Sequence, residues 1–540
     1  MAQRRCSTIG ISYLDIMSKN IELGNFDEAL RGADTLYQQI QNRLERDYLF
    51  FITMSNIASI FIDIGHMKCC CNSSRKGLKI LIDYKTDIIK QIGEDAYFYN
   101  LSNAKSNLII ENNPFNHSFS TIEQLIEIKS DLWKAFKISN ERNGKVIEPT
   151  YMVNLGNCLK RQFRIVEALS YYDQVNSLHL DIPQAWINRS ETLKILNMIS
   201  NTYSIEMLEQ VKSGYEKALL SKSIPPTWIE HYKELIDSHQ ADINDAYISA
   251  NINLDIHDKE KTRAEYEELS TYRKFCLDNK LSLSEHGLYC SCTGSSRDNL
   301  TIPTAAGIIG DFVIPMEMVL NRLKSEFSFA RHLYFQYVTE DDDHDLLHDS
   351  CFSELFNDEM LGIDVEKLRT AFRVCFGILD KIGIAICELF DLYPSHGKVY
   401  FQSFWQLDKE NRRDLFNKVK SPGLLALYSI ATDLNDKKEG EWSFLKKLRN
   451  DLEHDFVVVH KNEKPNDLYA SYGFIDNIVF IQEDEFIHHL KQMLQLTRSA
   501  IFSFVFAVRD KALNQKKEDN NYISNEIGWQ DYLFNEDGSI

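Results

Sequence analysis

The stretch KKLRNDLEHDF, residues 446–456, places three cations, three carboxylates, an amide and an imidazole within about three helical turns. A neutral imidazole accepts a proton near neutral pH, so His454 is a candidate general base. A planar guanidinium contacts two oxygens of one phosphate at once, so Arg449 is a candidate for stabilising the negative charge that develops there. Asn450 is suited to orient the imidazole or to contact the phosphate. Together these residue types predict acid–base chemistry on a phosphate group.

An amphipathic helix over residues 443–459 is expected to position this set. Its apolar stripe, which must face the protein's own core, consists of Leu445, Leu448, Leu452, Phe456 and Val459. Arg449 sits at the edge of the stripe, whereas Asn450 and His454 share a face largely opposite to it. Five residues on an ideal helix separate Arg449 from His454 by about 140°, so one straight helix does not bring both to one phosphate. A second copy of the helix in an isologous dimer, the commonest oligomer, would let them converge.

The remaining polar residues of the stretch are expected to assist. Lys446 and Lys447 can hold a neighbouring phosphate, and Asp451 and Glu453 are supporting residues. The chain carries a formal net charge of −19, which excludes a globally basic nucleic-acid binder but leaves room for a local basic patch such as this one. An alternative interpretation is a solvated helix decorated with ion pairs four residues apart, such as Arg449 with Glu453.

The length and the cysteine content suggest a cytoplasmic protein of several domains. The 540 residues suffice for two or three domains with cores of their own, and only ten prolines interrupt them, so long helices are expected. The eleven cysteines form no disulfide framework, which indicates reduced thiols in a cytosol. We expect no secretory signal and no membrane span, because no long apolar window without charge is evident.

The first half of the chain carries an approximate helical repeat. Gly24 lies five residues before Ala29, as at a turn between paired helices, and Gly65 with Cys70 repeats this step. The clearest unit has Leu155, Gly156, Leu159, Ala168, Tyr172 and Val175 at matching positions of a period of about 34 residues. This pattern resembles the tetratricopeptide repeat family over roughly 11–237 and predicts a helical solenoid over 1–265. The concave surface of such a solenoid typically binds a peptide or a protein. A generic helical bundle is the alternative.

Residues 266–306 mix Gly, Ser, Cys and Pro with little helical periodicity and predict an irregular connector. This segment contains a group of possible zinc ligands, namely Cys276, His286, Cys290 and Cys292. A C-x-C pair is not the usual C-x-x-C knuckle and no second close pair follows, so we expect plain thiols and leave zinc as the alternative. His344 and His348 stand four residues apart among aspartates, a second alternative for a metal in what is more typically a solvated acidic loop. We therefore predict neither a metal nor another cofactor.

Helical patterns resume over 307–515 and predict an up-and-down bundle of four or five helices, with an acidic tail over 516–540. The chain as a whole is expected to be all-α. The motif Arg449-Asn450-x-x-x-His454, late in a small helical bundle, resembles the HEPN domain ("higher eukaryotes and prokaryotes nucleotide-binding") over roughly 307–513. Nuclease members of that family carry Arg, a polar residue and then His four to six residues after the Arg.

The resemblance implies a metal-independent endoribonuclease. RNA supplies its own nucleophile, the 2′-OH; His454 would take that proton and Arg449 would stabilise the phosphorane, giving a 2′,3′-cyclic phosphate and a 5′-OH. The order of repeats followed by HEPN resembles prokaryotic conflict proteins, which implies an RNA-cleaving toxin or anti-phage effector. Its expected partners are RNA, such as tRNA, a second copy of the chain through HEPN, and a protein or peptide trigger or inhibitor on the repeats. A toxin subset has Tyr two residues after the His, where this chain has Phe456, so modification of that tyrosine is not expected.

Two other functions remain as alternatives. A non-catalytic adaptor would dock a partner on its repeats and use the HEPN half only to dimerise or to bind RNA or a nucleotide. A metal hydrolase would use His344 and His348. A P-loop nucleotidase and a serine hydrolase are disfavoured, since the sequence has neither a Walker stretch nor a G-x-S-x-G elbow.

Overall fold

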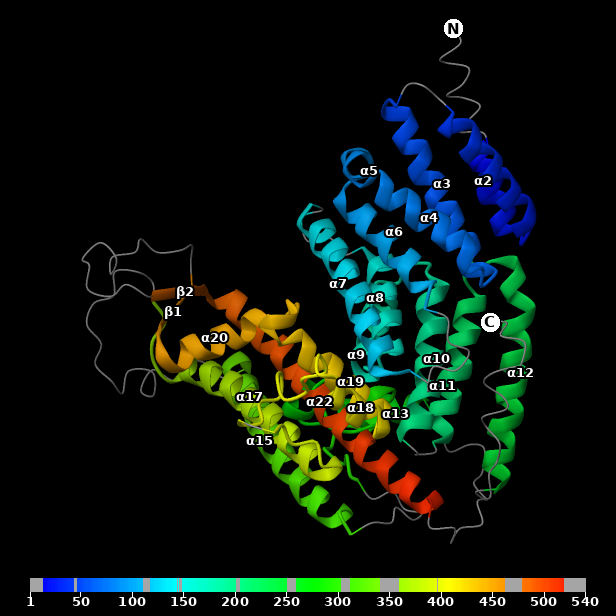
Figure 1. Cartoon of the computed structure of the whole chain (residues 1–540). Helices are drawn as coiled ribbons and strands as arrows, with labels where there is room; N and C mark the ends of the chain where they lie inside the picture. The colour runs from blue at the N-terminus through cyan, green and yellow to red at the C-terminus, as the bar shows by residue number, and fades with distance from the viewer. Residues whose placement is uncertain are drawn as a thin grey trace.

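The computed structural model describes residues 13–42, 46–109, 117–142, 144, 148–200, 204–249, 259–302, 311–339, 359–395, 397–461 and 478–518. Helices dominate these residues, and the sheet found among them has only two strands (Figure 1). The prediction of an all-α chain, with a helical solenoid followed by a helical bundle, is confirmed. His344, His348 and most of the acidic tail lie outside the described residues.

The first half is a stack of helices. They are α2 (Phe26–Gln41), α3 (Tyr48–Met67), α4 (Cys71–Asp83), α5 (Lys85–Ile92), α6 (Glu94–Ser106), α7 (Phe119–Arg142), α8 (Pro149–Arg161), α9 (Ile165–Ser177), α10 (Pro183–Ser200), α11 (Ile205–Leu219) and α12 (Pro226–Ser249). Consecutive helices pack as pairs: α3 with α4, α6 with α7, α8 with α9 and α10 with α11. A pair leaves one face apolar, so each pair is buried by the next and the stack grows as a solenoid.

Two glycines of the repeat pattern have different roles. Gly24 has a φ of +77° before α2, as expected at a turn. Gly65, also expected at a turn, instead lies inside α3, and the turn follows it. A Cβ at Gly65 would lie only 2.0 Å from Oγ of Ser74 in α4, so the glycine lets two helices cross closely. The expectation for Gly65 was wrong because helix crossings select small residues as strongly as turns do.

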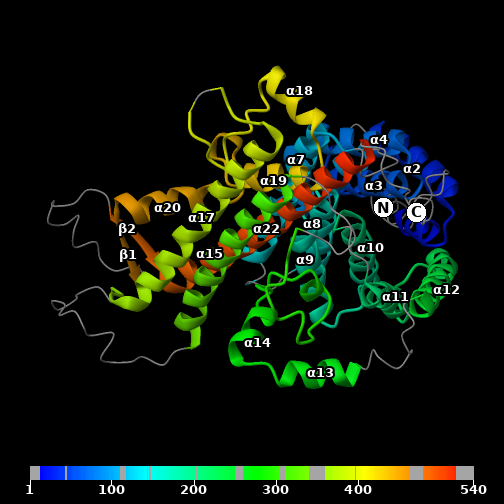
Figure 2. The same ribbon diagram turned by 90° about the horizontal axis from the view of Figure 1, so that it is seen from below.

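The second half is built around one long helix. Its elements are α15 (Val313–Thr339), α17 (Ile363–Phe390), α18 (Glu410–Lys418), α19 (Pro422–Asp433), η4 (Asp436–Lys438), α20 (Ser443–His454), β1 (Phe456–His460), β2 (Ile478–Gln482) and α22 (Glu483–Glu518). Helix α22 packs on α15, α17 and α19 of the bundle and also on α9 and α10 of the solenoid (Figures 1 and 2). It therefore ties the two halves together.

The segment between the halves is more ordered than expected. It contains α13 (Lys259–Glu267), α14 (Thr271–Asp278) and the 3-10 turn η3 (His286–Leu288), which run along one side of the molecule (Figure 2). Its apolar side chains are buried in the main core, namely Leu281, Leu283, Leu288, Leu300 and Ile302. The expectation of an irregular connector is wrong for α14, whose apolar residues were too few to show helical periodicity.

The described residues form two large hydrophobic cores and two small clusters. The main core contains buried residues from Phe119 in α7 to Ala512 in α22, and the first core contains residues from Met17 to Ala104 in the first helices. Helices α7 to α11 therefore share a core with the bundle. The proposed domain boundaries stay predictions, but the halves they separate are not independent in packing.

The expectation that no segment has the composition of a membrane span does not hold for helix α3. Its 20 residues are long and apolar enough to cross a membrane by length and composition alone. Two thirds of its most apolar window are buried inside the protein, against neighbours that include α2 and α4. Packing in the first core accounts for its apolar composition.

Candidate functional site

Helix α20 carries the candidate residues and is shorter than expected. It ends at His454, and the N–H of Asp455 donates to the Asp451 carbonyl oxygen at 2.8 Å. The chain then forms β1, which pairs in parallel with β2 in the register Phe456 to Ile478. Three consecutive valines favour extended backbone because β-branched side chains lose rotamers in a helix.

The predicted apolar stripe is correspondingly divided. Leu445 and Leu448 lie on α20 and are buried, and Val459 lies on β1 and is also buried. Leu452 is half-buried. Phe456 is 62% exposed, so its assignment to the core-facing stripe was wrong.

The side chain of Arg449 lies half-buried against α17. Its guanidinium carbon is 5.7 Å from the centre of the Phe376 ring, and its buried Nε has no hydrogen-bond partner in the part of the chain that the structure describes. Burial raises the pKa of Asp380 on α17, against the hydrogen bond from the Phe401 N–H and the charges of Arg449 and Lys446. Arg449 thus has a carboxylate nearby but forms no ion pair with the carboxylates of the described ranges.

The other candidates lie along α20 with different exposures. His454 and Glu453 are exposed at the end of the helix, and Asn450 is half-buried. Lys447 is exposed and Lys446 half-buried. Asp451 is buried, which raises the pKa of its carboxyl group, and its carbonyl oxygen caps the helix end.

The structure does not bring Arg449 and His454 to one point within a single protomer. The guanidinium faces α17, whereas the imidazole faces solvent. The ion pair between Arg449 and Glu453, expected of a merely solvated helix, is not formed between these two described residues. The geometry of one protomer is therefore that of an incomplete site.

Two further cations lie on α17 near this region, and sequence reasoning missed both. Arg369 donates to the Val457 carbonyl oxygen of β1 and pairs with Glu366 at 2.8 Å. Arg373 lies one helical turn before Phe376, the ring under Arg449, and reaches Glu366 only at 3.9 Å. No spacing in the sequence could reveal them, since they become neighbours of α20 only through tertiary packing.

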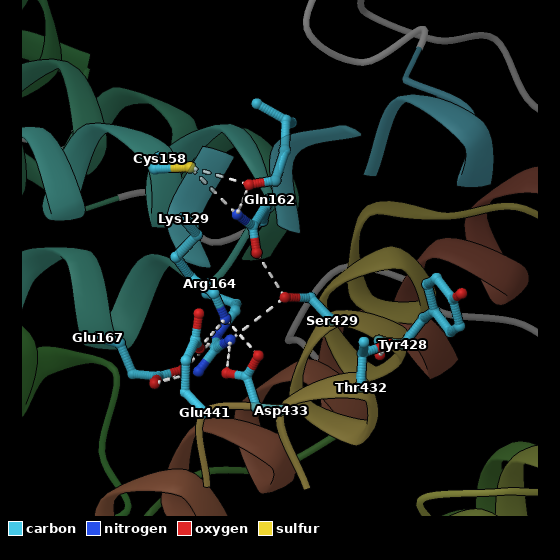
Figure 3. A network of polar contacts seen from close by, with 11 residues as sticks. Lys129, Cys158, Gln162, Arg164, Glu167, Tyr428, Ser429, Thr432, Asp433 and Glu441 are labelled. Carbon is cyan, nitrogen blue, oxygen red and sulfur yellow. Dashed lines mark hydrogen bonds and ion pairs between the residues drawn. The ribbon is translucent and has the colours of Figure 1, made fainter. Parts of the chain in front are cut away.

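The beginning of α20 is fixed to the solenoid by a buried polar network (Figure 3). Lys129 of α7 contacts Glu441, directly before α20, at 2.9 Å, and also contacts Asp433 at the end of α19. Arg164 pairs with Asp433 and with Glu167 of α9. All five side chains are nearly inaccessible to solvent, so these contacts are not screened as surface pairs are.

Burial and charge set the protonation of this network. Burial would raise the pKa of Asp433, but the charges of Arg164 and Lys129 outweigh it and hold the pKa below its ordinary value. Burial raises the pKa of Glu441 to about 7, opposed by Lys129 and assisted by the neighbouring Asp433 carboxylate. Glu441 is therefore the carboxyl group of this network whose protonation changes near neutral pH.

An aromatic contact reinforces the same junction. The ring centres of Trp133 on α7 and Trp442 at the start of α20 are 5.1 Å apart. Figures 1 and 2 show that α20 runs from this junction to the end of the bundle farthest from α2, where β1 and β2 lie. One helix therefore joins the solenoid contact to the Arg449–His454 motif.

The predicted cysteine group is divided by the structure. Cys276 is buried in α14 beside Tyr272 and Arg331. His286, Cys290 and Cys292 come together elsewhere, with their ligand atoms all within 4.8 Å of one another.

Comparison with protein families matches residues 310–511 to the family described as LA2681-like HEPN. The matched range covers the bundle from before α15 to near the end of α22, so the C-terminal half is similar to HEPN domains. No curated protein matches the chain. The match does not extend to the helix pairs of the first half, whose likeness to tetratricopeptide repeats rests on their spacing and packing.

Proposed function

We propose that this chain is a metal-independent endoribonuclease whose HEPN domains cleave RNA with Arg449 and His454 supplied by two protomers. The observation that carries the proposal is the Arg449-Asn450-x-x-x-His454 motif on the exposed end of α20, within a bundle that matches a HEPN family. HEPN domains are commonly ribonucleases, which supports an enzymatic role.

The chemistry follows from the two side chains. His454, exposed and at the end of its helix, takes the proton of an RNA 2′-OH. The 2′-oxygen attacks the adjacent phosphorus, the bond to the 5′-oxygen breaks, and that oxygen receives a proton. Arg449 neutralises the charge on the phosphorane oxygens, and Asn450 orients the imidazole or the phosphate. The products are a 2′,3′-cyclic phosphate and a 5′-OH.

Two protomers are needed because one helix separates the pair by about 140°. Isologous pairing of two α20 helices would place Arg449 of one protomer opposite His454 of the partner subunit. Phe456, exposed two residues after His454, would give this pairing an apolar contact.

The surrounding charges support RNA as the substrate class. Lys446 lies on α20 three residues before Arg449, and the exposed Lys447 adds a further cation. Arg373 lies on α17 one helical turn before Phe376, the ring that Arg449 contacts. The net charge of −19 keeps non-specific affinity for phosphate backbones low, so we infer selective cleavage of a structured RNA such as tRNA. In this proposal the protein acts in the cytoplasm as a toxin or anti-phage effector.

The junction at the start of α20 supports regulation by the solenoid. A protein or peptide trigger or inhibitor bound to the repeats would shift α7 and α9, which hold Glu441 and Asp433 through Lys129 and Arg164. A shift there changes the direction of α20 and hence the pairing of two motifs. A trigger shifts the equilibrium between the idle and the active arrangement only if it binds one of them more tightly than the other.

The first prediction tests the enzyme. Purified protein incubated with total RNA in EDTA is expected to produce fragments with cyclic phosphate and 5′-OH ends. Arg449→Ala or His454→Ala should reduce cleavage at least about a hundredfold, because each removes a group that acts in the transition state. The matched control is His231→Ala, an exposed histidine on the distant helix α12. Undiminished cleavage by the His454→Ala protein would end the catalytic proposal.

The alternative is a non-catalytic adaptor whose HEPN half only dimerises or binds RNA or a nucleotide. The separation of the guanidinium from the imidazole within one protomer is the observation in its favour. An adaptor would leave total RNA intact under every condition that yields dimers, whereas the proposed enzyme would not.

A further inference from the structure

We propose that His286, Cys290, Cys292 and Glu206 form a closed four-ligand site for a zinc-class dication that fastens the connector to the solenoid. The three connector ligands surround η3, and Glu206 lies in the first turn of α11. Nothing in the HEPN match covers this site, since the match begins at residue 310.

The spacing of the ligand atoms fits a single metal ion. Sγ of Cys292 and Nε2 of His286 are 3.7 Å apart. Two ligands at the usual zinc–sulfur and zinc–nitrogen distances and a tetrahedral angle would be separated by about 3.6 Å. Sγ of Cys290 completes a group in which no two ligand atoms are more than 4.8 Å apart.

Glu206 lies outside the group of three mutually close ligand atoms, but it contacts His286 and is the candidate for a fourth ligand from a different part of the chain. One of its carboxylate oxygens contacts Nε2 of His286, the same nitrogen that faces Cys292. It also contacts the Cys290 thiol through a hydrogen bond. Its side chain is only 11% exposed, whereas that of His286 is 35% exposed, so the site is closed on the Glu206 side and reachable from the other.

Local structure holds the ligands in place. The N–H of Cys290 donates to the His286 carbonyl oxygen at 2.9 Å, which folds the C-x-C pair back toward the imidazole. The N–H of Cys292 points to Sγ of Cys290 at 3.4 Å, the kind of contact that stabilises a metal-bound thiolate. The His286 ring stacks on Tyr289, which fixes the orientation of the imidazole.

The chemistry of the set favours zinc over hard cations. Two sulfurs, an imidazole and one carboxylate are soft to intermediate ligands, which suit Zn²⁺ and not Mg²⁺ or Ca²⁺. With Glu206 as the fourth ligand the site would have no open position, as in structural zinc sites.

A metal ion at this site would fix a segment that is already attached to the bundle by ion pairs. Glu285 pairs with Arg509 of α22 at 2.7 Å, and Asp298 pairs with Arg331 of α15 at 2.7 Å. The connector is thus attached to the HEPN half by ion pairs, and the metal would attach its other side to α11. This inference stands apart from RNA cleavage and does not depend on it.

The test uses the full-length protein and two metals. Purified without chelator, it should contain about one equivalent of zinc per chain. The apoprotein titrated with Co²⁺ should show intense thiolate-to-cobalt absorption and tetrahedral d–d bands, saturating at one equivalent. Zinc should raise the melting temperature of the apoprotein, while EDTA should reverse that rise.

Variants assign the ligands. Cys292→Ser should abolish the thiolate band or halve it, and Glu206→Gln should weaken Zn²⁺ binding at least about tenfold. The control Cys69→Ser, at an exposed cysteine between α3 and α4, should bind like the wild type. Absence of a saturating cobalt band in the wild-type protein would overturn the proposal. This test does not depend on whether the variants fold. A disulfide between Cys290 and Cys292 in freshly purified protein, or unchanged zinc affinity in Cys292→Ser, would also overturn it.

Discussion

The guanidinium of Arg449 has an environment unlike that of the structural arginines Arg331 and Arg412. Arg331 is paired with Asp298, and Arg412 donates to several backbone carbonyl oxygens. Arg449 rests on the Phe376 ring with its Nε unpaired within the described part of the chain. A buried arginine with a structural role is normally saturated with hydrogen bonds. In the proposed function, the remaining guanidinium donors of Arg449 would contact phosphate.

The second prediction tests this at the residue scale. Arg449→Lys is expected to lower the rate of RNA cleavage at least about tenfold, because an ammonium group loses the two-pronged contact with phosphate. Stability should change by no more than about 0.5 kcal/mol, since no ion pair is broken among the described residues. Initial rates and melting temperatures measure the two effects. Arg322→Lys is the control, because Arg322 is an exposed arginine on α15. Full activity in Arg449→Lys would show that the guanidinium shape is not used.

At the scale of elements, the end of α20 shows which helix boundaries the sequence pattern can predict and which it cannot. Leu445, Leu448, Leu452, Phe456 and Val459 follow helical spacing, so the pattern alone extends the helix to 459. The valines at 457–459 favour a strand, and β2 supplies the partner. The helical pattern and the observed strand both bury Val459; the exposure of Phe456 and the burial of Val457 and Val458 distinguish the strand from the helix. The long helices elsewhere were predictable because their apolar faces extend over several turns, whereas the short helix α14 was not.

The same limit applies to the site. The motif residues on α20 could be named from the sequence because they share one short element. Phe376 of α17 could not, since packing alone brings it beside Arg449. Glu206 was missed for the same reason, because it meets His286 only after the connector folds back on α11.

The third prediction concerns helix crossings. Gly65→Ala is expected to destabilise the protein by about 1–3 kcal/mol, because the added methyl group would overlap Ser74 at 2.0 Å. Gly377→Ala in α17 is the matched control, where the nearest atom is the flexible end of Lys381 at 3.6 Å. Alanine should stabilise that helix by up to about 1 kcal/mol. Thermal unfolding of both variants measures the contrast, and an equal effect of the two would contradict the role assigned to Gly65.

At the scale of the molecule, the two halves behave as one packed body. The main core runs from α7 to α22, and α22 touches both halves. The buried network adds specificity to this packing, because Lys129 and Arg164 of the solenoid meet Asp433 and Glu441 of the HEPN half (Figure 3). Breaking such a pair is costly, since it leaves a buried charge without a partner. Motion of the solenoid should therefore reach α20 without a flexible hinge.

The fourth prediction follows from the protonation of Glu441 in this network. In the folded protein its pKa is raised to about 7, whereas in the unfolded chain it returns toward its ordinary 4.5. Between these values the folded state binds more protons, so the free energy of unfolding falls as the pH rises and levels off above about 7. The full effect is at most about 3 kcal/mol. Glu441→Gln should remove this component, because the amide does not titrate.

Melting temperatures measured from pH 5 to pH 8.5 give the slope for each protein. Histidines titrate in the same window, so the comparison is made with Glu230→Gln, which changes an exposed carboxylate on α12 and should keep the wild-type slope. A Glu441→Gln protein with that same slope would mean that Lys129 keeps Glu441 charged throughout. The junction would then be a fixed ion-pair cluster at neutral pH, and control of α20 would have to come from movement of α7 and α9 alone.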